Sequence, residues 1–264
     1  MEVDFSMSQQ INQKKTVKKL RIDKILSHMG YGTRSEIKKA VKNGYVTVNG
    51  KLIKDSGMQV DPYEDLIEID GETVKYREFI YLMLHKPPGV ISATEDVREE
   101  TVIDLLNPEY ALFQPFPVGR LDKDTEGLLI LTNDGQLSHN LLSPKKHVPK
   151  TYEAIVSGEI GEKEIHAFQQ GVTLDDGYTT KPAVLEIISV DSGEEGDTSR
   201  VLVTIHEGKF HQVKRMFEAV QSKVLYLKRI SMGALQLDPL LPIGSYRELT
   251  EEELNILTGT DLAK

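Results

Sequence analysis

The chain has 264 residues, 39% hydrophobic and 28% charged, which is enough for one large domain or a large and a small one. It contains no cysteine, which excludes disulfides, thiolate metal sites and cysteine nucleophiles. No apolar run approaches the ~20 residues that a membrane helix needs, and the polar N-terminus has no signal-peptide core. We therefore expect a cytoplasmic protein without membrane contact.

The net charge of −9 hides an uneven distribution of charge along the chain. Residues 10–54 contain twelve Lys or Arg and two acids, whereas the remainder contains 20 basic and 39 acidic residues. A basic end on an acidic body predicts a localised contact with a polyanion. The alternative is a lysine-rich face that is merely solvated.

The N-terminal third begins with a polar tail, residues 1–17, which we expect to be flexible. From Leu20 the apolar residues recur mostly at helical spacing, and Gly30 ends that predicted helix. A second helix is predicted over 36–43, with Thr33 or Ser35 as its cap. Residues 45–53 then predict a hairpin around an Asn-Gly turn, and 66–69 predict a further strand.

This helix–helix–hairpin pattern resembles the S-four type RNA-binding module over residues 18–72. The matching positions are Arg21, Asp23, Lys24, Gly32, Arg34, Lys38, Gly44, Val48, Asn49 and Gly50. The resemblance implies that the second helix and the following loop present basic side chains to RNA phosphates, which position RNA without reading its sequence. The expected RNA contacts are Arg21, Arg34, Lys38, Lys39 and Lys42.

A larger domain is expected over residues 78–258, after a linker around 73–79. It opens with an apolar strand over 80–84 and a Lys-Pro-Pro-Gly turn, residues 86–89, which we interpret as a scaffold turn. Helices are predicted over 136–142, 161–171, 210–220 and 248–257. Strands are predicted over 148–156, 183–190, 200–206, 224–229 and 234–237, with a loop over 191–199. Because these elements do not alternate regularly, we expect an α+β fold with a mixed, largely antiparallel sheet and flanking helices.

The most informative segment runs from Pro117 to Gly135. Asp122 lies just before the apolar run 128–131, so an ionisable group stands directly before a predicted buried strand. Burying a carboxylate there costs free energy unless it has an ionic partner or serves a function. The segment resembles the central motif of the pseudouridine synthases, in the branch that modifies ribosomal RNA. The resemblance implies that Asp122 is the nucleophile and acts on a flipped-out nucleotide. The reaction is an isomerisation that needs no metal or other cofactor, and we expect neither.

Three further segments match the same family. In Glu207–Phe217 the resemblance implies that Lys214 pairs with Asp122, and Arg215 is the alternative cation for that role. Tyr152 matches the active-site tyrosine that lies against the uracil, and Leu227 matches the aliphatic residue beneath the flipped base. We expect Arg120 and Thr125 to flank the nucleophile at the substrate, and we interpret Asp124 and Glu126 as loop surface. The other interpretations of Tyr152 and Leu227 are ordinary core residues.

The sequence therefore predicts a monomeric isomerase that converts a uridine of small-subunit ribosomal RNA to pseudouridine, with an assembling particle as the expected partner. The small-subunit branch is favoured by the His-Gln-Val-Lys-Arg-Met-Phe run at 211–217. A large-subunit enzyme remains an alternative, as does a non-catalytic RNA-binding assembly factor. A glycoside hydrolase that pairs Asp122 with Asp124 or Glu126 is a third alternative, although neutral sugars offer no phosphates to the basic N-terminal region.

Overall fold

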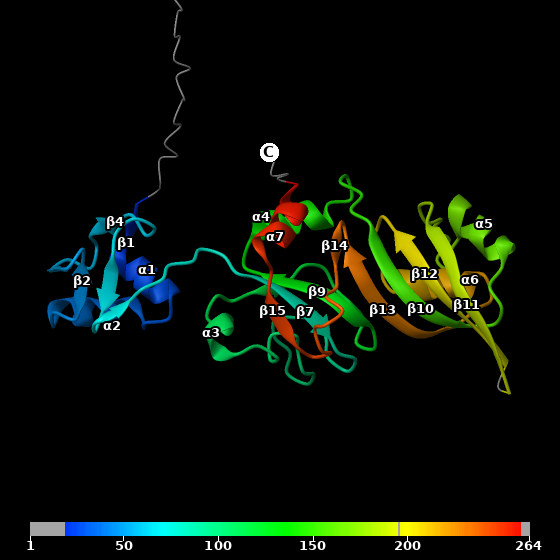
Figure 1. The fold of residues 1–264 in the computed structure, drawn as a ribbon, viewed down its shortest axis with the longest axis horizontal. Coiled ribbons are helices and arrows are strands. Elements are labelled where there is room, and N and C mark those ends of the chain that lie inside the picture. The colour runs from blue at the N-terminus through cyan, green and yellow to red at the C-terminus, as the bar shows by residue number, and fades with distance from the viewer. Residues whose placement is uncertain (1–18, 195, 260–264) are drawn as a thin grey trace, which may run out of the picture. The chain divides into compact units, whose positions relative to one another are not determined.

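The computed structural model describes residues 19–194 and 196–259 (Figure 1), so the predicted tail 1–17 lies outside the described residues. The chain divides into two compact units, one up to Arg77 and the other from Glu78 onward. In the described part of the chain no helix is long and apolar enough to cross a membrane.

The N-terminal unit packs two helices against short strands. The helices are α1 (Ile22–His28) and α2 (Arg34–Lys42), and the strands are β1 (Leu20–Arg21), β2 (Val46–Val48), β3 (Lys51–Leu52), β4 (Gln59–Val60), β5 (Ile67–Ile69) and β6 (Glu72–Thr73). Strands β3, β2, β5 and β6 form one antiparallel sheet, and β1 pairs with β4. Strand β6 and the buried Val74 extend this unit beyond residue 72.

Local sequence signals account for the turns of this unit. Thr33 caps α2 through a capping box with Glu36, which satisfies backbone N–H groups at the start of the helix. Asn49 and Gly50 both have positive φ values, as the predicted two-residue hairpin requires. Leu20 was predicted to belong to the first helix, but it pairs with Val60 as a strand residue instead.

The C-terminal unit is built on a nine-stranded sheet (Figure 1). Its strands are β7 (Tyr81–Lys86), β8 (Phe116–Pro117), β9 (Glu126–Thr132), β10 (Lys150–Ser157), β11 (Val184–Gly193), β12 (Gly196–Ile205), β13 (Val224–Met232), β14 (Leu235–Gln236) and β15 (Tyr246–Glu248). The main order is β11-β12-β10-β13-β9-β7-β15, with β14 beside β13 and β8 beside β9. Among these described strands only β13 and β9 pair in parallel, through two residue pairs. The sheet is thus mixed and largely antiparallel, as predicted.

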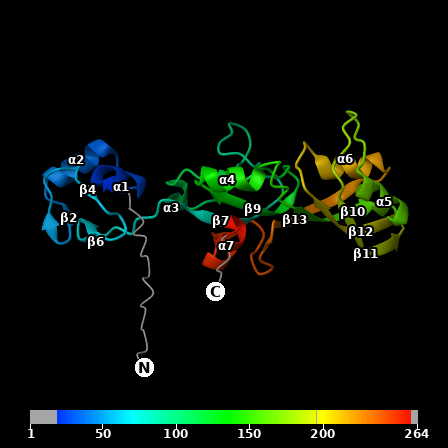
Figure 2. The ribbon, with the colours of Figure 1, turned by 90° about the horizontal axis from the view of Figure 1, so that it is seen from above.

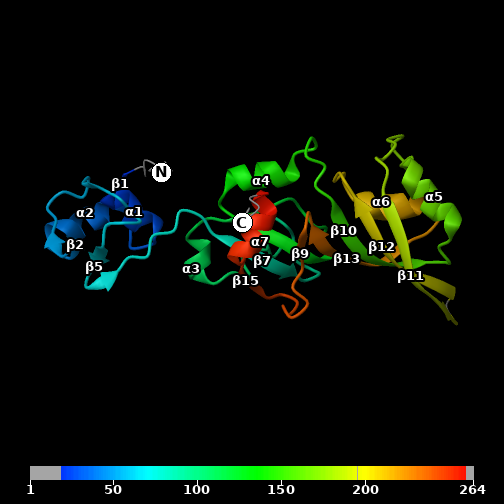
Figure 3. The same cartoon turned by 45° about the horizontal axis from the view of Figure 1, so that its top comes forward.

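Five helices accompany this sheet: α3 (Pro108–Ala111), α4 (Gly135–Leu142), α5 (Glu162–Gln170), α6 (Gln212–Ala219) and α7 (Glu251–Thr258). Helices α4 and α7 lie over β7 and β9 (Figure 2), where Leu137 and Leu254 pack with Met83 and Ile130. Helices α5 and α6 lie together beside the other half of the sheet (Figure 3), with the Phe168 and Phe217 rings 5.0 Å apart.

One predicted loop is wrong. Residues 191–199, rich in Gly and acids, were expected to be irregular, but β11 continues to Gly193 and β12 begins at Gly196. Cross-strand pairs such as Asp191–Thr198 extend the ladder to the tip of the hairpin. Pairing between neighbouring strands outweighs the weak β-propensity of this composition.

Candidate active site

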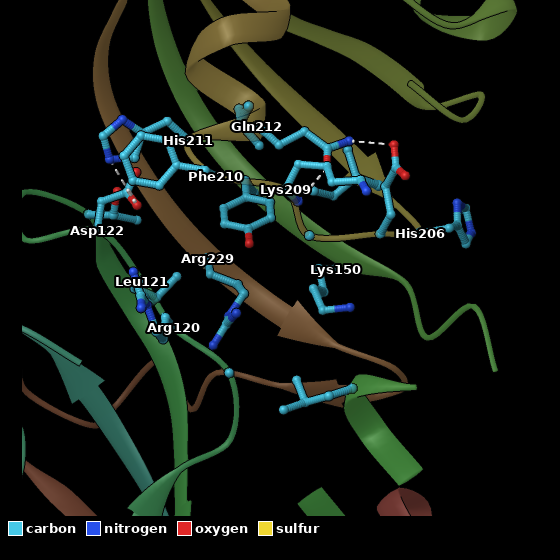
Figure 4. Close-up of a pocket in the computed structure, with 18 of the residues that line it drawn as sticks. Arg120, Leu121, Asp122, Lys150, His206, Lys209, Phe210, His211, Gln212 and Arg229 are labelled. Atoms are coloured by element: carbon cyan, nitrogen blue, oxygen red, sulfur yellow. Dashed lines mark hydrogen bonds and ion pairs between the residues drawn. The ribbon is translucent and has the colours of Figure 1, made fainter. Parts of the chain in front are cut away.

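Asp122 lies in the loop between β8 and β9, at the edge of a cavity of about 610 Å³. The cavity is lined by that loop, by β10 and β13, and by the segment that leads into α6. The Asp122 side chain is 26% exposed, so it is partly desolvated but still open to the cavity. Figure 4 shows Asp122 and His211 facing one another, with Arg229 and Lys150 farther along the same cavity.

The Lys-Pro-Pro-Gly turn holds the loop that carries Asp122 in place. The Nζ atom of Lys86 is buried and donates to the carbonyl oxygens of Thr125 at 3.0 Å and Lys123 at 3.3 Å. The backbone N–H of Gly89 donates to the Lys123 carbonyl oxygen at 2.7 Å. Burial lowers the pKa of Lys86 to about 8, despite the nearby carboxylates of Asp124, Asp122 and Glu126. The predicted scaffold turn thus positions the loop of the candidate nucleophile.

Two basic side chains from the start of α6 face the Asp122 carboxylate. The Nζ atom of Lys214 lies 3.5 Å from Oδ2 of Asp122, and Nε2 of His211 lies 3.6 Å from Oδ1. His211 has φ 47° and ψ 34°, a left-handed conformation that is uncommon outside glycine and often occurs at functional sites. The Phe210 ring stacks on the His211 ring with centroids 3.7 Å apart. The structure therefore brings Lys214 to Asp122, and it adds His211.

Asp124 was interpreted as loop surface, and it does lie exposed in the loop between β8 and β9, but it also has a partner. Its two carboxylate oxygens accept hydrogen bonds from Nζ of Lys214 at 2.6 and 2.8 Å, which lowers the pKa of Asp124. Lys214 is consequently shared between two carboxylates, and its contact with Asp124 is the shorter one. Residues 124 and 214 are ninety positions apart, so sequence spacing gave no signal of this contact.

Arg215, the alternative cation, turns away from Asp122. Its guanidinium forms ion pairs with Asp175 and Asp176, and their carboxylates raise its pKa. Consecutive residues on a helix point about 100° apart, so Lys214 and Arg215 cannot both face one carboxylate.

The other predicted site residues line the same cavity. Tyr152 and Leu227 are 8% and 5% exposed, and they come from the neighbouring strands β10 and β13. Thr125 is buried, and Arg120 is exposed at the rim. Lys150 and Arg229 also line it. Lys150 stands two positions before Tyr152, but only the strand register places Arg229 beside them.

Comparisons with known proteins show the family of this chain. A family model described as RNA pseudouridylate synthase matches residues 80–219, and an S4 domain model matches residues 20–67. The chain belongs to the RNA pseudouridine synthase family. It is an enzyme that isomerises uridine to pseudouridine.

The relatives of this synthase cover nearly its whole length. It is 56% identical over 90% of its length to an uncharacterized RNA pseudouridine synthase, YtzG, of Bacillus subtilis (strain 168), 98% of which is covered. It is 38% identical to ribosomal large subunit pseudouridine synthase B of the same organism, over 90% of this chain and 95% of that relative. It is 39% identical to ribosomal small subunit pseudouridine synthase A of Vibrio vulnificus (strain CMCP6), over 89% of this chain and 98% of that relative. A solved structure described as a pseudouridylate synthase matches with a TM-score of 0.62 and 37% identity, over 90% of this chain and 99% of that one.

The predicted RNA contacts of the S4 domain differ in how available they are. Arg34, Lys38, Lys39 and Lys42 are exposed, and all four lie on α2, whose buried side holds Ile37 and Val41. Arg21 is engaged: its guanidinium donates to both carboxylate oxygens of Asp23, at 3.0 and 2.7 Å. The cations of α2 are thus free to meet a phosphate, whereas Arg21 would have to share its charge with Asp23.

Within the described residues, no three His, Asp or Glu side chains gather in a way that could hold a metal ion. The side chains that line the synthase cavity include cations, aromatic rings, apolar residues and the carboxylates of Asp122 and Glu207.

Proposed function

We propose that this synthase modifies a uridine of small-subunit ribosomal RNA, with Asp122 as the nucleophile and the S4 domain as the docking surface. The observation that carries the proposal is the placement of Asp122 between Lys214 and His211, at the edge of a cavity large enough for a nucleotide. Lys214 and the His211 ring both lie within 4 Å of this partly buried carboxylate, and the ionised carboxylate is the form that can attack.

The reaction breaks the bond between ribose C1′ and uracil N1 and forms a bond between C1′ and uracil C5. The C5 proton then leaves, and N1 gains a proton, so the atoms and charge balance. We assign Asp122 to attack, Lys214 to hold its charge, and Tyr152 to lie against the uracil and accept the C5 proton. Leu227 supports the flipped base from the neighbouring strand, and Thr125 and Arg120 line the path that the nucleotide takes into the cavity.

The choice of small-subunit RNA rests on the 211–217 run, because whole-chain identity does not discriminate. The chain is 39% identical to a small-subunit enzyme and 38% identical to a large-subunit enzyme. In the run, His211 and Lys214 both face Asp122. We therefore base the branch assignment on the resemblance of this run to the small-subunit enzymes.

Chemical mapping of pseudouridine in ribosomal RNA from a deletion strain tests the proposal. We expect one site in the small-subunit RNA to lose its modification, and the intact gene to restore it where an Asp122→Asn gene does not. Loss of a site in the large-subunit RNA would contradict the branch assignment. If the Asp122→Asn gene restored the modification, the assignment of the nucleophile would be wrong.

A further inference from the structure

Two cations of the catalytic cavity are buried without a carboxylate partner in the described part of the chain. Lys150 is 9% exposed and Arg229 is 2% exposed. The Nζ atom of Lys150 donates to the Val148 carbonyl oxygen at 3.0 Å, and Nε of Arg229 donates to the Leu128 carbonyl oxygen at 2.8 Å. Nη2 of Arg229 is buried with no hydrogen-bond partner among the described residues. Buried cations in proteins are normally paired, so this arrangement calls for an anion from outside the chain.

Both cations stand next to the residues that hold the base. Lys150 precedes Tyr152 by two positions on β10, and such residues project from the same face of a strand. Arg229 lies directly opposite Tyr152 on β13, two positions after Leu227. The burial and electrostatic repulsion between these two cations together lower the pKa of Lys150 to about 8. Figure 4 shows Arg229 and Lys150 across the cavity from the Asp122–His211 pair.

The proposed reaction places negative charge on the uracil ring. If Asp122 attacks the sugar, the C1′–N1 bond breaks and its electron pair remains on N1, from which it spreads to the O2 and O4 carbonyl oxygens. If Asp122 adds to C6 instead, the electron pair of the C5–C6 double bond moves toward O4. Either route leaves an anionic ring in the cavity until C5 has bonded to C1′. Charge that develops in a desolvated site is stabilised most by cations already held in place.

We propose that Lys150 and Arg229 form a binding subsite for the anionic uracil ring and are further catalytic residues of this synthase. This inference rests on the proposed function. The ring, rather than an RNA phosphate, is the occupant because both cations are more than nine-tenths buried beside Tyr152 and Leu227. Phosphates of a strand remain at the mouth of the cavity, where the exposed Arg120 and Lys209 lie.

Single-turnover kinetics on RNA that contains the mapped uridine test the subsite. We expect Lys150→Met to lower the rate about 100-fold, comparable to the loss of one oxyanion donor in other enzymes. The dissociation constant for RNA should stay within about twofold, because the charge on the ring exists only during the reaction. Lys150→Arg should recover most of the rate, and Arg229→Lys should be faster than Arg229→Met. Lys163→Met, which removes one exposed cation from α5, is the matched control and should leave both quantities unchanged.

The outcomes separate the possible roles. A weaker RNA affinity with an unchanged rate at saturating enzyme would show that the two cations bind a phosphate, and would overturn the proposal. An unchanged rate for both Met variants would overturn it as well. Circular dichroism and thermal unfolding show whether each variant is folded, and the comparison of Lys150→Arg with Lys150→Met remains informative if Arg229→Met does not fold. A wild-type enzyme that modified no ribosomal RNA would instead refute the proposed function itself.

Discussion

The two units of this synthase use positive charge in opposite ways. On α2 of the S4 domain, Arg34, Lys38 and Lys42 are exposed, and α2 buries only its apolar side. In the catalytic unit, Lys86, Lys150 and Arg229 are buried, and carbonyl oxygens of the backbone accept hydrogen bonds from each of them. Exposed charges are screened by salt and suit a polyanion of any sequence. Buried charges act strongly over short distances and suit one ligand atom in one position.

The largest expected effect comes from Asp122, the proposed nucleophile. Asp122→Asn keeps the shape of the side chain but removes its charge, so the rate of pseudouridine formation should fall by at least about 1,000-fold. RNA affinity should change little, because the S4 domain and the cavity rim are untouched. Single-turnover assays and filter binding measure the two quantities. Substantial residual activity would contradict the assignment of Asp122.

The next effect concerns the shared cation. Lys214→Met should lower the rate about 100-fold, because His211 would then be the one basic side chain of the described residues within 4 Å of the Asp122 carboxylate. Lys214→Arg should restore part of this loss. Arg215→Met is the matched control from the adjacent position, and it should have a much smaller effect because Arg215 pairs with Asp175 and Asp176. Equal losses for Lys214→Met and Arg215→Met would contradict the geometry.

A smaller effect is expected from the exposed cations of the S4 domain. Lys38→Glu combined with Lys42→Glu should weaken RNA binding about tenfold or more. The plot of log affinity against log salt should also become less steep, by the amount that corresponds to the loss of about two phosphate contacts. The single-turnover rate at saturating RNA should be unchanged. Lys163→Glu on α5 provides a control for charge reversal outside the S4 domain. An unchanged salt slope would show that α2 does not meet phosphates.

The smallest effect concerns stability. The pKa of Lys150 in the folded protein is about 8, below its ordinary value of 10.5, so between these pH values the unfolded state binds more protons and stability rises with pH. Lys150→Met removes this titration. It should therefore be more stable than the wild type at pH 7, by on the order of 1 kcal/mol, and the difference should shrink at pH 9.5.

Urea unfolding at the two pH values measures this difference. Lys86, whose pKa is also about 8, is present in both proteins, so its contribution cancels. A difference in unfolding free energy that does not depend on pH would contradict the burial of a charged Lys150.

Much of the fold could be predicted from the sequence, because its signals are local. Thr33 and Glu36 define the start of α2, and Asn49-Gly50 defines the hairpin turn. The 191–199 hairpin could not be predicted, because its strands are held by pairing with each other and not by composition. Local signals therefore decide helix starts and tight turns, whereas strand ends depend on the partner strand.

The candidate site likewise has residues that could be predicted from local motifs and contacts that could not. Asp122, Lys214, Tyr152 and Leu227 lie in recognisable motifs, and the structure brings all four to one cavity. The shared contact of Lys214 with Asp124 joins residues ninety positions apart, and no sequence spacing indicates it. Arg229 meets Tyr152 only through the register between β10 and β13. Contacts of this kind depend on how strands far apart in the chain are paired.

The parallel pairing of β9 with β13 has a consequence for how the catalytic groups are assembled. The loop that carries Asp122 leads into β9, whereas Leu227 and Arg229 belong to β13. The short parallel pairing at Glu126 and Gly127 therefore joins this loop to the strand that carries Leu227 and Arg229. A methyl group at position 127 would lie 2.2 Å from the backbone oxygen of Arg229, in a backbone conformation with φ +107° that favours glycine. The absence of a side chain at Gly127 thus lets β9 approach β13 closely, directly after the loop that carries Asp122.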